Sequence, residues 1–191
     1  MTPDMLRALL QDLRLAREAE LRTKFGRSLP FADGLFDRWE RARRLGFGPE
    51  ASIYDSACVL GDVRVGAKTW IGPYVMLDGS GGGISIGSTC SVSAGVHIYT
   101  HDTVLWALSG GVLPRRVGAV SIGERVYIGS QSVIGRGVSI GDMAVIAANS
   151  FVREDVPSRA IVGGVPAVVI GHVEGEGDAV RLVFASDPRP L

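Results

Sequence analysis

The sequence has few cysteines, no excess of one charge and no long apolar run. Its 191 residues include two cysteines, too few for a disulfide framework and without metal-site spacing. The 20 basic and 20 acidic side chains balance, which argues against nucleic-acid binding. No stretch approaches the roughly 20 apolar residues of a membrane span, and charges near the N-terminus argue against a signal peptide. These absences predict a cytoplasmic protein without a nucleic-acid partner or membrane span.

Glycine, in contrast, is abundant. The chain contains 26 glycines, about twice the usual share. Hydrophobic residues make up 46% of the chain, so disorder does not explain this content. Glycine is therefore expected to meet a backbone requirement that recurs along the chain.

The N-terminal part carries a helical pattern. Leucines recur at near-helical spacing in the first 21 residues, and a second amphipathic segment runs from Ala32 to Leu45. We expect an N-terminal helical segment over residues 1–50. Neither amphipathic stretch contains a constellation of residues typical of catalysis.

From Ala51 on, aliphatic residues recur with a six-residue period. Fourteen marked positions are all Val, Ile or Leu: Ile53, Val59, Val65, Ile71, Leu77, Ile86, Val92, Ile98, Ile122, Ile128, Ile134, Ile140, Ile146 and Val152. Four residues after each mark, twelve of the fourteen positions hold a small or β-branched residue. That residue and the next mark are two apart, so both point the same way from a short strand. Turns of such a coil stack as parallel strands and bury the marks in columns.

The repeats resemble a known family. Val65-Gly-Ala-Lys-Thr-Trp, Ile128-Gly-Ser-Gln-Ser-Val and Ile134-Gly-Arg-Gly-Val-Ser resemble the hexapeptide repeat of left-handed β-helix acyltransferases. The segment Val162-Gly-Gly-Val-Pro-Ala-Val-Val-Ile170 resembles the end of many such domains. The resemblance implies a mainly β fold, a left-handed parallel β-helix over residues 51–170, followed by a C-terminal tail, 171–191. It also implies a homotrimer with acetyl-CoA in the cleft between subunits.

The six-residue phase breaks twice. The first break, Asp78–Gly83, adds three residues and is interpreted as a bulged corner, because no Lys-Ser or Lys-Thr follows as in a phosphate-binding loop. The second follows Ile98-Tyr-Thr-His-Asp-Thr103 and places residues 104–121 in a protruding loop. Long insertions in compact folds are usually functional. This region resembles family members that acetylate sugars of bacterial surface polysaccharides or their nucleotide-sugar precursors.

Two histidines flank the second break. His101 matches the catalytic histidine of the family by its place before the loop, and imidazole suits a general base because its pKa lies near working pH. Asp102 is expected to orient the His101 ring and stabilise its protonated form. His97 is the alternative base. Together with Tyr99 and Trp106, it is otherwise assigned to substrate binding.

Acetyl-CoA is expected as a dissociable co-substrate, lying along the outside of the coil where side chains are small. By family position, the residues that would contact it are Tyr127, Gly129, Ser130, Ala147, Ala148, Asn149, Arg153 and Pro166. Corner geometry is the alternative explanation for Gly129 and Ala147. The expected reaction is direct transfer to the acceptor, with no acyl group carried by the enzyme.

Two other functions are compatible with such a coil. A γ-type zinc carbonic anhydrase would need His172, beyond the coil, as a third ligand with His97 and His101. A catalytically silent scaffold or binding protein would need neither the histidine nor the long loop. The resemblance leaves open whether the acceptor offers a hydroxyl or an amine, which sugar carries it, and the acyl chain length. No metal is expected.

Overall fold

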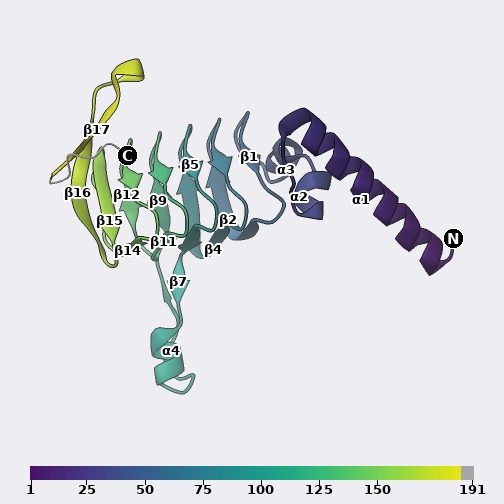
Figure 1. Cartoon of the computed structure of the whole chain (residues 1–191). Coiled ribbons are helices and arrows are strands. Elements are labelled where there is room, and N and C mark those ends of the chain that lie inside the picture. The colour runs from purple at the N-terminus through teal and green to yellow at the C-terminus, as the bar shows by residue number, and fades with distance from the viewer. Residues whose placement is uncertain (186–191) are drawn as a thin grey trace.

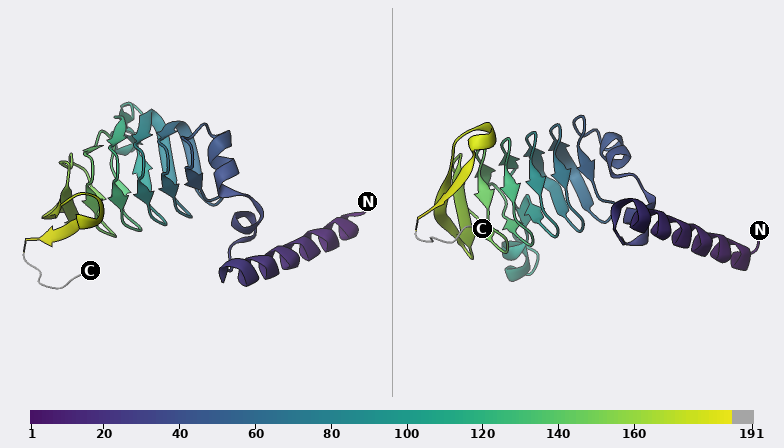
Figure 2. Two further views of the ribbon diagram at one scale, coloured as in Figure 1. Left: turned by 90° about the horizontal axis from the view of Figure 1, so that it is seen from above. Right: turned by 45° about the horizontal axis from the view of Figure 1, so that its top comes forward.

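The computed structural model describes residues 1–185. A coil of short strands forms the body, helices lie at its N-terminal end, and an arm projects from its side (Figure 1). The three N-terminal helices are α1 (Pro3–Phe25), α2 (Phe31–Leu35) and α3 (Arg38–Arg44). Thr2 caps α1 by accepting a hydrogen bond from the Met5 N–H, and α1 extends away from the coil (Figure 2). The expected N-terminal helical segment is therefore present.

The coil consists of short parallel strands that form three faces. Face 1 contains β1 (Ser52–Ile53), β3 (Trp70–Ile71), β5 (Ser91–Val92), β10 (Tyr127–Ile128), β13 (Val145–Ile146) and β15 (Ala160–Gly164). Face 2 contains the first halves of β2 (Cys58–Val65) and β4 (Met76–Ile86), followed by β6 (His97–Tyr99), β11 (Val133–Ile134) and β14 (Phe151–Val152). Face 3 contains the second halves of β2 and β4, then β9 (Val120–Ile122) and β12 (Ser139–Ile140).

The marked aliphatic residues stack in register inside this prism. On face 1, Ile53 pairs with Ile71, which pairs with Val92, and the column continues through Ile128 and Ile146. Faces 2 and 3 carry equivalent columns. Thirteen of the fourteen marks are buried, and Val59 in the first turn is half-buried. The predicted columns of buried aliphatics are thus confirmed.

Glycines at the corners permit close stacking of successive turns. A Cβ added at Gly129 would lie 2.5 Å from the Ala148 nitrogen, closer than atoms can approach. One turn further on, Asn149 takes a left-handed φ of 56° and donates from its N–H to the Ser130 carbonyl at 2.9 Å. The recurring glycines therefore serve the backbone, as the composition indicates.

The C-terminal residues differ from the expected tail. Residues 171–185 contain the end of β16 (Ala167–Glu174), a 3-10 turn (Gly177–Ala179) and β17 (Arg181–Phe184). β16 pairs antiparallel with β15, and β17 pairs antiparallel with β16. Val173 and Phe184 pack with Met143 and Ile161 in a small second core, and this burial accounts for the extra strands. The remainder of the expected tail, 186–191, lies outside the described residues. Within residues 1–185, no helix has the length and apolar content needed to cross a membrane.

The two phase breaks occur one coil apart on the same edge, between faces 2 and 3. The first lies within β4, where the register with β2 shifts between Gly61 and Val63, so the predicted bulged corner is confirmed. The second forms the arm: β7 (His101–Asp102) pairs antiparallel with β8 (Arg116–Val117), and α4 (Val104–Leu108) lies at the tip. The first break follows Leu77 and the second follows Ile98. These two aliphatic residues pair with each other on face 2, so the breaks lie next to each other on successive coils.

Candidate functional site

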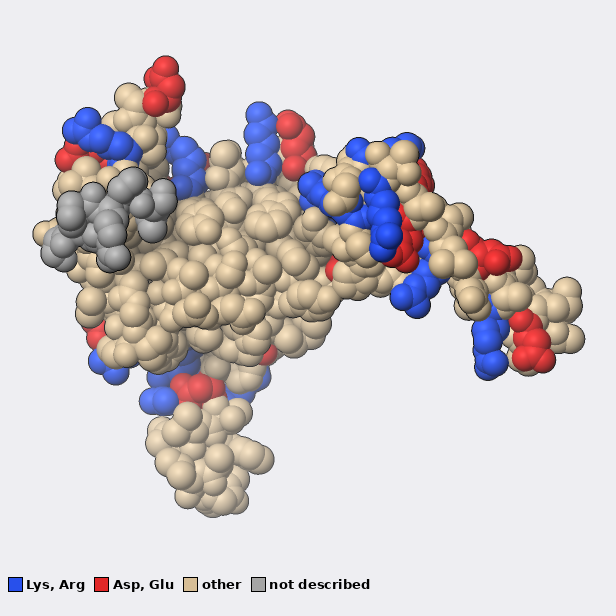
Figure 3. All heavy atoms as spheres, in the orientation of Figure 1, with Lys and Arg blue, Asp and Glu red and all other residues tan. Residues whose placement is uncertain are grey.

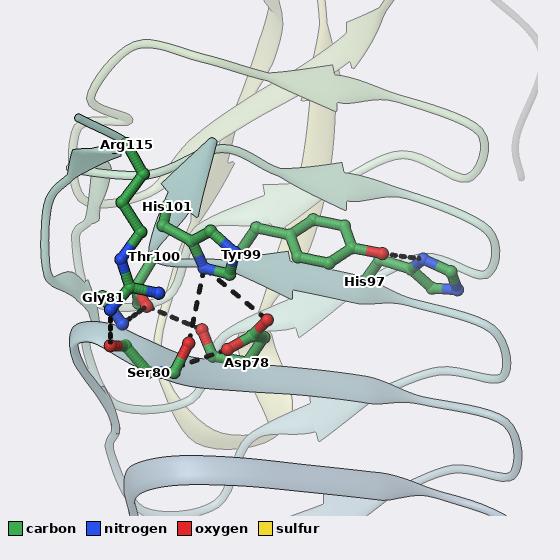
Figure 4. Close-up of polar contacts among 8 residues, drawn as sticks. All are labelled: Asp78, Ser80, Gly81, His97, Tyr99, Thr100, His101 and Arg115. Atoms are coloured by element: carbon green, nitrogen blue, oxygen red, sulfur yellow. Dashed lines mark hydrogen bonds and ion pairs between the residues drawn. The ribbon is translucent and has the colours of Figure 1, made fainter. Parts of the chain in front are cut away.

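His101 lies at the base of the arm, against the bulge of the preceding coil (Figure 4). Its Nδ1 atom is 3.6 Å from the Asp78 carboxylate and 3.4 Å from the Ser80 hydroxyl. Among the described residues, its Nε2 atom makes no hydrogen bond. An Nδ1–H directed at Asp78 leaves Nε2 with a lone pair, which is the tautomer that a general base needs.

Asp78 supplies a negative charge beneath the ring. Burial acts to raise its pKa, but hydrogen bonds from Ser80 and the nearby charges of His101 and Arg115 outweigh this effect and lower the pKa below its ordinary value. Only 7% of the residue is exposed. The carboxylate is therefore charged at neutral pH and lies beside the His101 ring.

The bulge is held rigidly against the base of the arm. The Thr100 hydroxyl donates to the Asp78 carbonyl at 2.7 Å and accepts from the Gly81 N–H at 2.8 Å. Arg115, from the arm, donates to the Ser80 carbonyl at 3.0 Å. A Cβ at Gly81 would lie 2.4 Å from the Thr100 carbonyl oxygen, so this approach requires glycine. The two irregular segments thus position one another.

Asp102 does not orient His101, contrary to expectation. Its carboxylate accepts hydrogen bonds from Arg116 at 3.0 and 3.1 Å and from Arg136 at 2.6 Å. The hydrogen bond from Arg136 is the main cause that lowers the pKa of Asp102 to about 2. Adjacent residues of a strand point to opposite sides, which explains why Asp102 faces away from its neighbour. Asp102 instead joins the arm to the next coil, and the carboxylate beside the His101 ring is that of Asp78.

His97 and Tyr99 form a pair of their own on face 2. The His97 Nδ1 and the Tyr99 hydroxyl are 2.9 Å apart, and the rings meet edge to face at 5.7 Å between centroids. Figure 4 shows this pair extending along the coil away from the Asp78 carboxylate. His97 therefore lacks the carboxylate partner that His101 has.

A groove opens beside His101. It has a volume of about 520 Å³ and is lined by Tyr99, His101, Asp102, Arg116, Val133, Gly135, Arg136, Phe151 and Arg153. It follows the edge between faces 2 and 3 from the arm toward the next two coils. Three other predicted site residues, Tyr99, Asp102 and Arg153, thus lie in the same groove as His101.

The other residues assigned to acetyl-CoA lie at a different edge, between faces 1 and 2. Gly129 stacks on Ala148, and the turn that contains Pro166 adjoins them because the Gly164 N–H donates to the Ser150 hydroxyl at 3.2 Å. Tyr127, Ser130, Ala147 and Asn149 belong to the same two coils. Trp106 is 51% exposed on α4, away from the coil (Figure 1). The predicted residues therefore form two groups within one chain.

The remaining histidine and the cysteines have other partners. His172 Nε2 lies 2.8 Å from Glu174 on the C-terminal hairpin. Residues 1–185 contain no group of three or more His, Cys, Asp or Glu side chains placed to hold a metal ion. Cys90 is buried, and burial raises the pKa of its thiol, so packing explains it better than nucleophilic chemistry.

Sequence comparisons identify relatives of the coil. The family model for the hexapeptide repeat of succinyl-transferase matches residues 119–154. The putative acetyltransferase YvoF of Bacillus subtilis is 37% identical over 87 residues, 46% of each chain. The carnitine operon protein CaiE of Escherichia coli O7:K1 is 31% identical over 134 residues, 67% of this chain and 68% of CaiE. The matched region thus spans about half of YvoF and two thirds of CaiE.

Solved structures agree with these relatives. The hexapeptide-repeat acetyltransferase VCA0836 of Vibrio cholerae, complexed with acetyl-CoA, has a TM-score of 0.60 and 29% identity, over 86% of this chain and 89% of that chain. The D94A mutant of AntD, an N-acyltransferase of Bacillus cereus complexed with dTDP and coenzyme A, has a TM-score of 0.61 and 28% identity, over 66% and 72%. These likenesses confirm the mainly β, left-handed parallel β-helix. The chain belongs to the hexapeptide-repeat acyltransferase family.

Proposed function

We propose that this protein is an acetyl-CoA-dependent acetyltransferase that acts on a hydroxyl or amino group of a sugar, either a nucleotide sugar or a surface-polysaccharide precursor, in the cytoplasm. The observation that carries the proposal is His101, held through Nδ1 by Asp78 and Ser80 with Nε2 unoccupied, at the base of the arm. The acetyl-CoA complex of VCA0836 and the dTDP and coenzyme A complex of AntD support the co-substrate and the acceptor class.

In the proposed mechanism, His101 acts as the general base. Acetyl-CoA, when bound, supplies the thioester carbonyl. The His101 Nε2 atom takes the proton from the acceptor hydroxyl or amine as that group forms its bond to the carbonyl carbon. Asp78 would stabilise the imidazolium that results, and a backbone N–H would stabilise the oxyanion. The carbon–sulfur bond then breaks, and His101 returns the proton to the departing thiolate, so coenzyme A leaves as a thiol. Cys58 and Cys90 take no part, so no acyl group is carried by the enzyme.

The two groups of predicted residues are brought together if three copies assemble. The outward positions of face 1 include Trp70, Ser91, Tyr127 and Val145, and those of face 2 include Met76, His97, Val133 and Phe151. None of these is Lys, Arg, Asp or Glu, and Figure 3 shows a broad surface over the coil that is free of these four residue types. In a homotrimer, the edge with Gly129 and Ala148 of one copy would face the His101 groove of the next.

Substitution of His101 tests the proposal. With an acceptor found by screening amino and hydroxy sugars and their nucleotide conjugates, release of coenzyme A thiol measures turnover. His101→Ala is expected to lower kcat by about 10²–10⁴ and to leave thermal stabilisation by acetyl-CoA intact. Near-normal turnover of the variant would remove His101 as the base. A scaffold protein would show no stabilisation by acetyl-CoA, even in the unsubstituted chain.

A further inference from the structure

We propose that the groove beside His101 takes an acceptor with an anionic group, a phosphate or a carboxylate, and that Arg136 and Arg153 bind this group. This inference rests on the proposed acetyl transfer at His101 and narrows its acceptor class. The phosphates of the coenzyme offer the same oxyanion chemistry, and their distance from the thioester separates the two sources.

The groove carries an excess of positive charge. Its lining includes three arginines, Arg116, Arg136 and Arg153, and a single acidic residue, Asp102. Asp102 engages Arg116 and Arg136, so one positive charge of that cluster is uncompensated. Arg153 approaches the exposed Glu154 only at 3.5 Å. An ion pair of that length between exposed groups is weak, so Arg153 adds positive charge to the groove.

The arginines also keep hydrogen-bond donors available. Arg136 uses its Nε to reach Asp102 at 2.6 Å, and within residues 1–185 its terminal Nη atoms have no partner. A guanidinium has five N–H donors arranged for bidentate contact with a carboxylate or phosphate. Asp102 fixes the position of Arg136 without occupying those outer donors. The site is therefore preorganised for an oxyanion.

The distance from the base favours the acceptor over the coenzyme. Arg136 bonds to the residue next to His101, and Arg153 lies on the adjoining coil, because β11 pairs with both β6 and β14. Successive coils are about 4.8 Å apart, so both guanidiniums lie within one or two coils of the base. In acetyl-CoA, the extended pantetheine arm separates the thioester from the phosphates. A coenzyme with its thioester at His101 therefore places its phosphates beyond Arg136.

The rest of the lining suits a ring attached to such a group. Tyr99, Val133 and Phe151 line the face 2 side of the groove, next to the edge that carries His101 and the arginines. Aromatic side chains pack against the apolar faces of rings while polar groups fix orientation. An acceptor with a ring against these side chains and an anion at Arg136 and Arg153 would place a hydroxyl or amine at His101.

Titration of the full-length protein with inorganic phosphate, by calorimetry, tests the inference. Titrations are made with and without saturating coenzyme A. We expect saturable phosphate binding with the same Kd in both conditions. Arg153→Gln should raise this Kd about tenfold, the effect of one lost charge-assisted bond. Arg125→Gln is the matched control. Arg125 is also an exposed arginine at a corner, but it lies at the edge between faces 3 and 1, where it pairs with Glu176.

The alternative outcomes separate the sources. Displacement of phosphate by coenzyme A, or weaker coenzyme A binding by Arg153→Gln, would assign the arginines to the coenzyme and overturn the inference. Absence of saturable binding, or an equal Kd for Arg153→Gln and the parent, would also overturn it. Phosphate binding that depends on Arg153 in a protein with no affinity for coenzyme A would refute the acetyltransferase proposal and leave the anion site established.

Discussion

At the scale of single residues, the site depends on a carboxylate and an imidazole contributed by successive coils. In the proposed mechanism, Asp78 stabilises the imidazolium that forms at His101 after proton transfer. Ser80 approaches the same Nδ1 atom, so rotation of the ring would break two interactions. Asp78 is thus proposed as a positioning residue, since it would act on the acceptor only through His101.

Asp78→Asn should therefore lower kcat by about 10–100-fold with little change in acetyl-CoA binding. Asp78→Glu, which keeps the negative charge beside the ring, should recover part of this loss. Steady-state kinetics of both variants, with kcat and KM determined separately, measure these effects.

Asp62→Asn is the matched control, because Asp62 lies on the same edge one coil earlier and pairs with Arg64 rather than a histidine. A kcat of Asp78→Asn equal to that of the parent would contradict the role of Asp78. Recovery of activity by Asp78→Glu distinguishes a charge effect on His101 from a general loss of structure.

At the scale of elements, the arm is fastened to the coil by Asp102. Its carboxylate joins β7 to Arg116 on β8 and to Arg136 on the next coil. Asp102→Asn should increase amide hydrogen exchange of residues 104–117 a few-fold at neutral pH, because exposed ion pairs contribute modestly. Exchange in β1 and β3, at the far end of the coil from this contact, should stay unchanged.

The ion pairs of Asp102 also predict how the attachment of the arm to the coil depends on pH. The pKa of Asp102 is lowered from 3.8 to about 2 in the folded chain. A lowered pKa means that the stabilising contribution is fully present above about pH 4 and is lost as the pH falls through about 2. The exchange difference between parent and Asp102→Asn should thus persist from pH 7 to 5 and vanish near pH 2. A difference that disappears between pH 7 and 5 would contradict this origin.

Close stacking at the corners makes a second prediction for the elements. Gly129→Ala places a Cβ 2.5 Å from the Ala148 backbone nitrogen, whereas at Gly135, which has the same place in its repeat, the nearest atom is 3.3 Å away. Gly129→Ala should lower the free energy of unfolding by about 2–3 kcal/mol, and Gly135→Ala by clearly less. Chemical denaturation measures both, and equal effects would contradict the stacking argument.

The sequence predicts the regular part of this protein well and the irregular part less well. Ile71, Ile128 and their equivalents reveal the coil because burial in a column demands the same residue type at every turn. Interruptions of so regular a repeat are easy to recognise, and they locate the candidate site. The partner of His101 was missed because Asp78 lies in the other break, and only the shared edge of two coils brings them together. Strand alternation after His101 was the available signal against Asp102.

At the scale of the whole molecule, the His101 groove lies at one border of face 2, and the stacked corner of Gly129 and Ala148 lies at the other. If acetyl-CoA binds at that corner, as proposed, a neighbouring subunit must complete the site. Subunits with different defects should therefore complement each other.

Coexpression of two inactive variants tests this sharing. His101→Ala removes the base, and Ala148→Trp fills the exposed corner where the pantetheine arm would lie, without touching the groove. In randomly mixed trimers, a site is intact when an Ala148→Trp subunit supplies His101 and a His101→Ala neighbour supplies the corner. Each condition holds in half of the cases, so about one quarter of the parent activity should return. Each variant alone must remain trimeric by sedimentation. A mixture as inactive as either variant would show instead that each chain completes its site alone.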